Sequence, residues 1–157
     1  MNLSELRSTQ DIYVEATPSE LFALVTSIER TGEWSPICRH CWWEDENDKH
    51  QKGAWFKGLN ETPDRTWKTR SLVTAYEPDR HFEWAVNGEV VTWGFILSPE
   101  GEGTRLTETW EVTDKGLDFF KDKYGEDWQA QIAERRDAAL EGIPATLEAI
   151  KRIAESS

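Results

Sequence analysis

Glu108 is the side chain best placed to do chemistry, because it shares an expected strand face with apolar neighbours. Strand alternation puts its carboxylate between Leu106 and Trp110. Burying a polar group without a partner costs on the order of 1–3 kcal/mol, and more when the group is charged. Glu108 therefore either has a structural partner, such as a tryptophan N–H, Asn60 or Arg136, or it serves a bound molecule. In the second case it orients a ligand or transfers a proton, with a pKa raised by desolvation.

The second candidate is Arg136, which falls within the apolar stripe of the expected C-terminal helix, with Arg135 at the edge of that stripe. A cation that faces a core needs a partner or water. One interpretation is that Arg136 covers apolar surface with its stem and extends its charged end to the mouth of a cavity. The other is that it polarises a carbonyl, or holds an enolate or carboxylate, of a bound molecule.

Cys38 and Cys41 form a C-x-x-C motif around His40. Zinc sites usually show a second ligand pair at regular spacing, and only His50 and His81 remain, both expected at exposed positions. A redox C-x-x-C usually begins a helix, whereas this one enters an expected strand. We therefore expect ordinary thiols and no metal site. The sequence contains no phosphate-binding glycine loop and no dinucleotide fingerprint, so we expect no cofactor either.

Nine tryptophans in 157 residues are the anomaly of the composition. Each can bury about 150–250 Å², which together exceeds what a small core needs, so part of this aromatic surface is expected to line a cavity for a flat apolar ligand. The alternative for each ring is core packing. The candidate ligand-binding residues lie on inward strand faces, on the final helix or at the turn after the first helix: Trp34, Phe56, Asn60, Trp67, Thr69, Ser71, Trp84, Trp93, Phe95, Glu108, Trp110 and Arg136.

A long helix over residues 127–154 must position these side chains. Its apolar residues recur at steps of three and four, which is one stripe of a 3.6-residue period. Pro144 lies inside it, removes one backbone hydrogen bond and should bend the axis. Nothing after this helix covers the stripe, so we expect the stripe to lie against the preceding strands.

Upstream, period-two patterns dominate. Thr17, Pro18 and Glu20 indicate a helix start with a capping box after the first strand, and Asn87-Gly88 indicates a hairpin. The sequence predicts one α+β domain over residues 1–157, in which a seven-stranded curved antiparallel sheet surrounds the long C-terminal helix. Two short helices follow the first strand, and residues 1–9 form an N-terminal tail. The expected strands are 10–16, 39–45, 54–60, 66–76, 81–86, 90–97 and 104–112.

The charge balance excludes some partners. The formal net charge is −12, and such a surface repels phosphate backbones and anionic lipid headgroups. No apolar run approaches the ~20 residues of a membrane span, and residues 1–9 lack the pattern of a signal peptide. We therefore expect a cytoplasmic protein, monomeric or homodimeric, that binds neither nucleic acid nor membranes.

Several short motifs, in their order along the chain, carry a family resemblance. They are Ala16-Thr17-Pro18-Ser19-Glu20, Glu33-Trp34-Ser35-Pro36, residues 53–60, Thr107-Glu108-Thr109-Trp110 and residues 142–147. With them, the chain over about residues 10–155 resembles the START-like, or SRPBCC, superfamily, and within it the polyketide cyclase/dehydrase and lipid-transport group. The resemblance implies a helix-grip fold with a hydrophobic cavity between the concave sheet face and the last helix.

Three functions are consistent with these observations. The chain binds a small hydrophobic molecule, aromatic or similar to a polyketide or lipid; it is a cyclase, aromatase or dehydratase that acts without metal or nucleotide; or it is a protein-interaction module, such as a chaperone co-factor or a toxin–antitoxin partner. Binding is favoured because the expected cavity has aromatic residues but no evident catalytic pair. The third function needs a large exposed apolar patch, which this polar sequence does not indicate.

Overall fold

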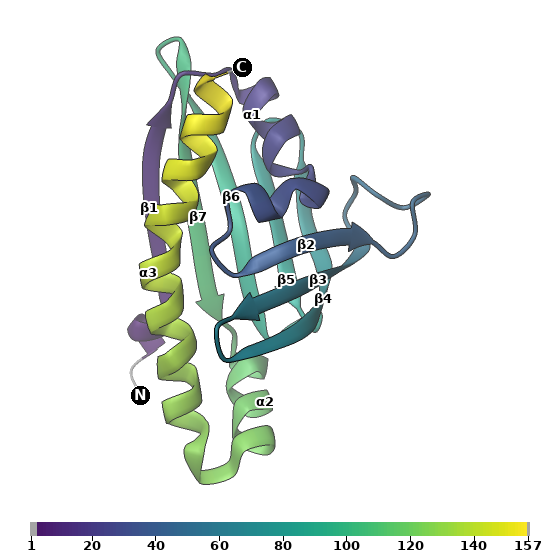
Figure 1. The fold of residues 1–157 in the computed structure, drawn as a ribbon, viewed down its shortest axis with the longest axis vertical. Helices are drawn as coiled ribbons and strands as arrows, with labels where there is room; N and C mark the ends of the chain where they lie inside the picture. Colours follow the sequence, from purple (N-terminus) through teal and green to yellow (C-terminus); the bar gives the residue numbers. More distant parts are fainter. Residues whose placement is uncertain (1–2, 157) are drawn as a thin grey trace.

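The computed structural model describes residues 3–156, and they form one curved antiparallel sheet wrapped around a long helix (Figure 1). The strand order is β1-β7-β6-β5-β4-β3-β2. This is the helix-grip α+β fold that the sequence predicts. The strands are β1 (Arg7–Val14), β2 (Cys38–Trp43), β3 (Trp55–Thr62), β4 (Arg65–Glu77), β5 (His81–Val86), β6 (Val91–Glu100) and β7 (Gly103–Val112).

Two short helices follow β1, as expected. Helix α1 (Pro18–Val25) begins with the predicted capping box: the Glu20 backbone N–H donates to Thr17 Oγ1 at 3.1 Å, and the Thr17 N–H donates to Glu20 Oε2 at 3.4 Å. The 3-10 helix η2 (Ile28–Glu33) follows. Together they bury Leu21, Phe22, Leu24, Val25 and Ile28 at one end of the sheet.

The start of the chain differs from the expected tail. Residues 1 and 2 lie outside the described part, but the 3-10 helix η1 covers Leu3–Leu6 and β1 already begins at Arg7. The buried side chain of Leu6 anchors this segment in the core. Arg7 pairs with Glu111 and Ser8 with Trp110, so backbone hydrogen bonds to the edge of β7 extend the strand where the side chains give no alternating pattern.

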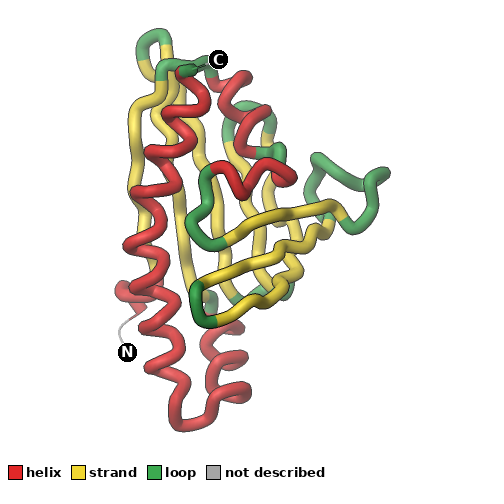
Figure 2. The backbone as a smooth tube through the Cα atoms, in the orientation of Figure 1, coloured by secondary structure: helices red, strands yellow, loops and turns green. Residues whose placement is uncertain are grey.

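Helix α3 (Trp128–Glu155) crosses the concave side of the sheet, and its inner side is buried at Ile132, Ala139, Ile143, Thr146, Leu147, Ala149 and Ile150. Helix α2 (Asp114–Tyr124) precedes it and is capped by Thr113 Oγ1, which accepts from the Gly116 N–H at 2.9 Å. The 3-10 turn η3 (Gly125–Asp127) joins α2 to α3 at the lower end of the molecule, whereas the C-terminal end of α3 lies near α1 (Figures 1 and 2).

The sheet bends most where β2, β3 and the start of β4 turn across the front of the other strands (Figure 2). Register shifts accompany this curvature, one between Cys38 and His40 in β2 and one between Val73 and Ala75 in β4. No helix within residues 3–156 combines the length and the hydropathy that a bilayer-spanning segment requires.

Candidate functional site

A cavity of about 470 Å³ lies between the concave face of the sheet and α3. Its wall continues onto α2 and onto the segment that joins η2 to β2. All the predicted ligand-binding residues except Arg136 line it: Trp34, Phe56, Asn60, Trp67, Thr69, Ser71, Trp84, Trp93, Phe95, Glu108 and Trp110. The volume falls within the range of about 300–1,000 Å³ that is usual for small-molecule sites.

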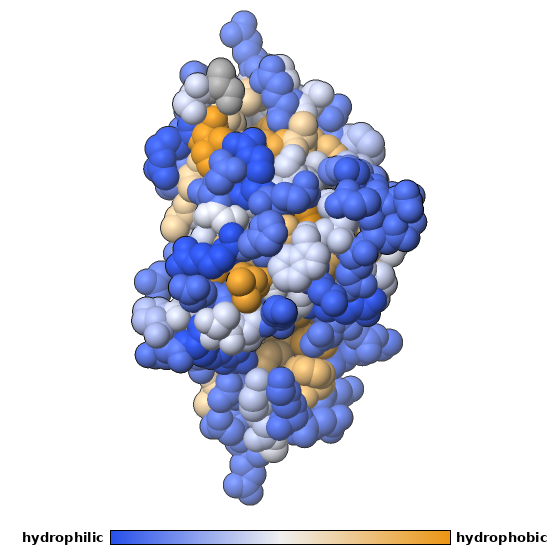
Figure 3. All heavy atoms as spheres, turned by 45° about the vertical axis from the view of Figure 1, so that its right-hand side comes forward, coloured by the Kyte–Doolittle hydropathy of each residue, from blue (hydrophilic) through white to orange (hydrophobic). Residues whose placement is uncertain are grey.

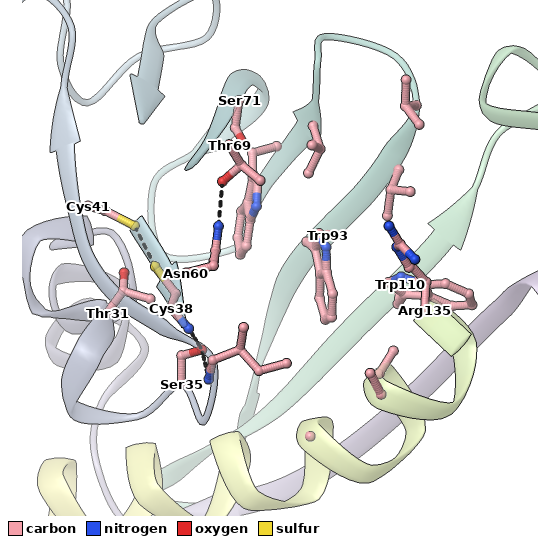
Figure 4. Close-up of a pocket in the computed structure, with 18 of the residues that line it drawn as sticks. Thr31, Ser35, Cys38, Cys41, Asn60, Thr69, Ser71, Trp93, Trp110 and Arg135 are labelled. Atoms are coloured by element: carbon pink, nitrogen blue, oxygen red, sulfur yellow. Dashed lines mark hydrogen bonds between the residues drawn. The ribbon is translucent and has the colours of Figure 1, made fainter. Parts of the chain in front are cut away.

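Aromatic rings cover the sheet side of the cavity. Antiparallel pairing places Trp84 opposite Trp93, and Trp93 opposite Trp110, so that three indoles follow one another across β5, β6 and β7. The Trp84 ring also contacts Phe56 and Phe95, with ring centroids 6.1 and 5.9 Å apart. Trp110 is fully buried, whereas Trp93 is partly accessible and points into the open space of the pocket (Figure 4). The sheet side of the cavity is therefore largely an aromatic surface.

Glu108 is the buried carboxyl of this surface. Its residue is only 4% exposed, and its Oε1 has no hydrogen-bond partner within residues 3–156. Burial raises its pKa from the ordinary 4.5 to about 8, because no nearby charge or hydrogen bond offsets the desolvation of the ionised form. The side chain is therefore mainly protonated at neutral pH and has an O–H group to donate to a ligand.

Asn60, one of the structural partners considered for Glu108, bonds elsewhere. Asn60 Nδ2 donates to Thr69 Oγ1 at 3.2 Å and to the Trp67 carbonyl oxygen at 3.4 Å (Figure 4). These bonds use the amide N–H groups of Asn60 and join β3 to β4, with β5 and β6 between them and Glu108 on β7. Asn60 and Thr69 thus form a polar patch opposite the buried carboxyl.

The expectation for Arg136 is corrected, because it does not line the cavity. Its guanidinium lies toward the N-terminal segment, 3.8 Å from the Glu5 carboxylate and 3.3 Å from that of Asp137. Successive helical residues point about 100° apart, so the two arginines leave the apolar stripe on opposite sides. Arg135 takes the cavity side: it donates to Tyr124 Oη at 3.1 Å and to Gln131 Oε1 at 2.8 Å.

The mouth of the cavity is cationic, which sequence reasoning did not predict. Arg65, Lys68, Lys123 and Arg135 line it, and none of them forms an ion pair within the described residues. The Arg65 guanidinium lies 4.0 Å from the centre of the Trp67 ring. The carboxyl groups of the lining are Glu108, which is neutral, and Glu134. Positive charge therefore gathers at this mouth in a chain of net charge −12.

The two cysteines also belong to the cavity wall, a position on which no prediction was made from the sequence. Cys38 and Cys41 both line it, with their Sγ atoms 3.2 Å apart (Figure 4). No group of three or more His, Cys, Asp or Glu side chains within residues 3–156 is arranged to hold a metal ion. The register shift in β2 brings both cysteines to the cavity side, and no residue pattern in the sequence predicts that shift.

Residues 5–148 match the sequence family described as polyketide cyclase/dehydrase and lipid transport. The chain belongs to this family. Among solved structures, a polyketide-cyclase-like protein from Corynebacterium glutamicum is 49% identical, over 95% of this chain and 91% of that chain, with a TM-score of 0.69. No curated protein matches the sequence of this family member closely enough to count as a relative.

Solved structures with lower sequence identity share only the fold with this chain. The di-domain ARO/CYC protein StfQ, from the steffimycin biosynthetic pathway, is 16% identical; the match covers 98% of this chain and 52% of StfQ, with a TM-score of 0.70. A START superfamily protein from Mycobacterium smegmatis is 14% identical over 96% of this chain and 98% of that chain, with a TM-score of 0.66. These matches agree with the helix-grip fold of this polyketide cyclase/dehydrase family member.

Proposed function

We propose that this protein binds a small, flat, largely apolar molecule in the cavity between the sheet and α3. The ligand belongs to the aromatic, polyketide-like or lipid-like compounds, and it carries a hydrogen-bond acceptor toward the sheet and an acidic group toward the mouth. Apolar burial supplies the affinity at about 25 cal/mol per Å², so a ligand that buries about 500 Å² gains roughly 12 kcal/mol, which leaves micromolar affinity after an association cost of about 4 kcal/mol.

The observation that carries this proposal is the unpartnered carboxyl of Glu108 within an aromatic wall. Folding leaves a neutral O–H donor in an apolar site, at the full desolvation cost of its unpaired oxygen. A ligand carbonyl or hydroxyl that accepts from this group recovers part of that cost. The neighbouring indoles restrict the remainder of the ligand to flat, apolar shapes.

The cationic mouth is the reason for proposing that the ligand carries an acidic group. Arg135 is held by Gln131 and by Tyr124 and keeps donors free, and Lys123 lies on the same side of the mouth. An acidic group there completes charge-assisted hydrogen bonds without entering the apolar interior. The overall negative charge of the protein makes this local positive charge selective rather than a general attraction for anions.

Two matched dyes test the proposal. Anilinonaphthalene sulfonate carries an acidic group on an aromatic body, and phenylnaphthylamine is its neutral counterpart. Both should bind the folded chain and quench its tryptophan emission, with the sulfonate dye the tighter of the two. Absence of quenching by either dye, and by a panel of flavonoids, sterols and fatty acids, would refute binding in this cavity.

Neighbouring arginines provide a matched pair of variants. Arg135→Gln should weaken the sulfonate dye about fivefold, roughly the 1 kcal/mol of a half-exposed ion pair, and leave the neutral dye unchanged. Arg136→Gln removes the same charge from outside the cavity and should alter neither affinity. Equal effects of the two substitutions would mean that the mouth does not select the acidic group. Glu108→Gln, which replaces the O–H donor with an amide NH2 group, should change the affinity for both dyes alike.

The second candidate function is a cyclase, aromatase or dehydratase reaction. A carboxyl with a pKa of about 8 is suited to general acid–base catalysis near neutral pH, and Glu108 lines the cavity with a buried oxygen that has no hydrogen-bond partner within residues 3–156. Ring closure or dehydration of a linear poly-β-keto substrate by the parent, lost in Glu108→Gln while dye affinity persists, would favour the enzyme over the binder. The face in Figure 3 has apolar side chains only in small groups among hydrophilic ones, so nothing there favours an interaction module.

A further inference from the structure

A β-bulge brings the two cysteines of the C-x-x-C motif to the same side of β2. In a regular strand, side chains three positions apart point to opposite faces. Here Cys38 pairs with Asn60, His40 pairs with Leu59 and Cys41 pairs with Gly58, so Arg39 is an extra residue in the ladder. The extra residue turns both thiols toward the cavity, where their Sγ atoms lie 3.2 Å apart.

Local contacts hold this arrangement in place. Ser35 Oγ accepts from the backbone N–H of Cys38 at 2.9 Å and from that of Ile37 at 3.2 Å, which fixes the start of the strand. Gly58 lies beneath the thiols, and a Cβ atom there would meet Cys41 Sγ at 3.4 Å and Cys38 Sγ at 3.5 Å. The glycine on β3 therefore leaves room for two sulfur atoms side by side.

The two thiols differ in access and in acidity. Cys41 is 4% exposed, whereas Cys38 is partly accessible on the cavity wall. The pKa of Cys38 is lowered, mainly by its hydrogen bond with Cys41 and further by a backbone hydrogen bond with His40 and the charge of Arg39. The pKa of Cys41 is raised by the same contact with Cys38 and by burial. One sulfur is thus suited to attack, and the other to resolve the product.

We propose that Cys38 and Cys41 are a redox-active dithiol in the cavity wall, which hydroperoxides that enter the cavity oxidise to a reversible intramolecular disulfide. This proposal is independent of the identity of the ligand that the cavity binds. The sulfurs need to approach by only about 1 Å to reach bonding distance, which side-chain rotation supplies without separating β2 from β3.

The reaction balances in two steps. The Cys38 thiolate attacks one peroxide oxygen, the O–O bond breaks, and the leaving oxygen takes a proton to give water or an alcohol. The resulting sulfenic acid is then attacked by the Cys41 sulfur: the S–S bond forms, the S–O bond breaks, and the hydroxyl leaves as water with the Cys41 proton. The dithiol loses two electrons and two protons, and the peroxide gains them. A small thiol such as dithiothreitol reverses the change.

The test uses the full chain, reduced, freed of reductant and treated with one equivalent of hydrogen peroxide or cumene hydroperoxide. The expected product has lost two hydrogen atoms by intact mass, contains a Cys38–Cys41 link in a non-reducing digest, and returns to the starting mass with dithiothreitol. Cys41→Ser should stop at a sulfenic acid on Cys38 that dimedone traps. Cys38→Ser should react about tenfold more slowly than Cys41→Ser, because its remaining thiol, that of Cys41, is buried whereas Cys38 is partly accessible.

Several results would overturn the proposal. They are an unchanged mass, disulfides only between chains, oxidation that runs directly to sulfinic acid, or a Cys38→Ser chain that reacts as fast as Cys41→Ser. A rate that rises when a chelator is added would mean that the thiols hold a metal ion instead, and would also overturn it. If a serine variant does not melt cooperatively, iodoacetamide on the native chain replaces it: Cys38 should be alkylated well before Cys41, and the reverse order would contradict the assignment.

Discussion

Replacing Glu108 with glutamine should remove a large part of the pH dependence of stability between pH 5 and 9. Burial raises the pKa of this carboxyl from 4.5 to about 8. A raised folded-state pKa means that the folded chain holds the proton more tightly than the unfolded chain does. The penalty for burying Glu108 is therefore absent below pH 4.5, grows as pH rises through the neutral range, and is complete above about pH 8. Glutamine does not titrate, so its variant carries no such penalty.

The magnitude follows from that shift. Moving the pKa from 4.5 to about 8 corresponds to a total of about 5 kcal/mol, of which about 4 kcal/mol develops between pH 5 and 9. The steepest part, between roughly pH 5.5 and 7.5, has a slope of about 1.4 kcal/mol per pH unit. The stability of Glu108→Gln relative to the parent should therefore rise by about 4 kcal/mol as the buffer changes from acid to alkaline.

Urea unfolding followed by tryptophan fluorescence measures this difference. With a urea dependence of about 2 kcal/mol per molar, the midpoint of the variant should move by about 2 M relative to the parent over this pH range. The carboxyl groups that the two chains share contribute equally to both unfolding free energies, so their titration does not affect the difference between variant and parent. Glu102→Gln, in the exposed turn between β6 and β7, is the control for replacing a carboxylate by an amide at the surface.

A difference between Glu108→Gln and the parent that stays constant from pH 5 to 9 would refute the reasoning. It would mean that the carboxyl is solvated or paired in the folded state, so that folding does not shift its pKa. The proposed hydrogen-bond donor at neutral pH would then be lost as well, because an ionised Glu108 only accepts.

Three further predictions concern other parts of the chain. Ile143→Asp should abolish cooperative folding, because Ile143 is 1% exposed and the new charge would have no partner. A variant with the thermal transition of the parent would mean that this face of α3 is not the buried one. Thr17→Ala should cost about 1 kcal/mol of stability by urea unfolding, since it removes the Thr17 half of the capping box of α1, and an unchanged midpoint would contradict that contribution. A chelator should leave the melting temperature unchanged, and one tightly held zinc per chain by elemental analysis would contradict this.

The strands and the final helix were predictable because side-chain periodicity and turn residues specify them locally. The alternation around Glu108 placed this residue on the buried face, and the capping residues Thr17 and Glu20 marked the start of α1. The start of β1 was not predictable in this way. Arg7 and its neighbours are polar on both sides, and the strand exists there because β7 offers backbone partners from the other end of the chain.

The parts of the site that were not predicted depend on the direction in which individual side chains point, which side-chain periodicity does not specify closely enough. The periodicity placed Arg136 within the apolar stripe of α3 and Arg135 at its edge, whereas in the structure Arg135 contacts Tyr124 of α2 on the cavity side and Arg136 lies toward Glu5. Regular strand alternation would place Cys38 and Cys41 on opposite faces of β2. The extra residue in the ladder places them on the same face. The missing partner of Glu108 was likewise unpredictable, because a partner can come from any strand or helix of the fold.

The pairing of β1 with β7 has a consequence for how the chain becomes folded. Its ladder joins Arg7 to Glu111, 104 residues apart, so the hairpins between β2 and β7 can form before β1 finds its neighbour. Closing so long a loop costs entropy before the new contacts repay it, which favours refolding in milliseconds to seconds rather than microseconds. During synthesis at about 5–20 residues per second, the aromatic inner face also lacks its cover until α3 has left the ribosome. We expect the nascent chain to spend seconds as a partial sheet that holdase chaperones recognise, and to complete its fold only after α3 has emerged from the ribosome.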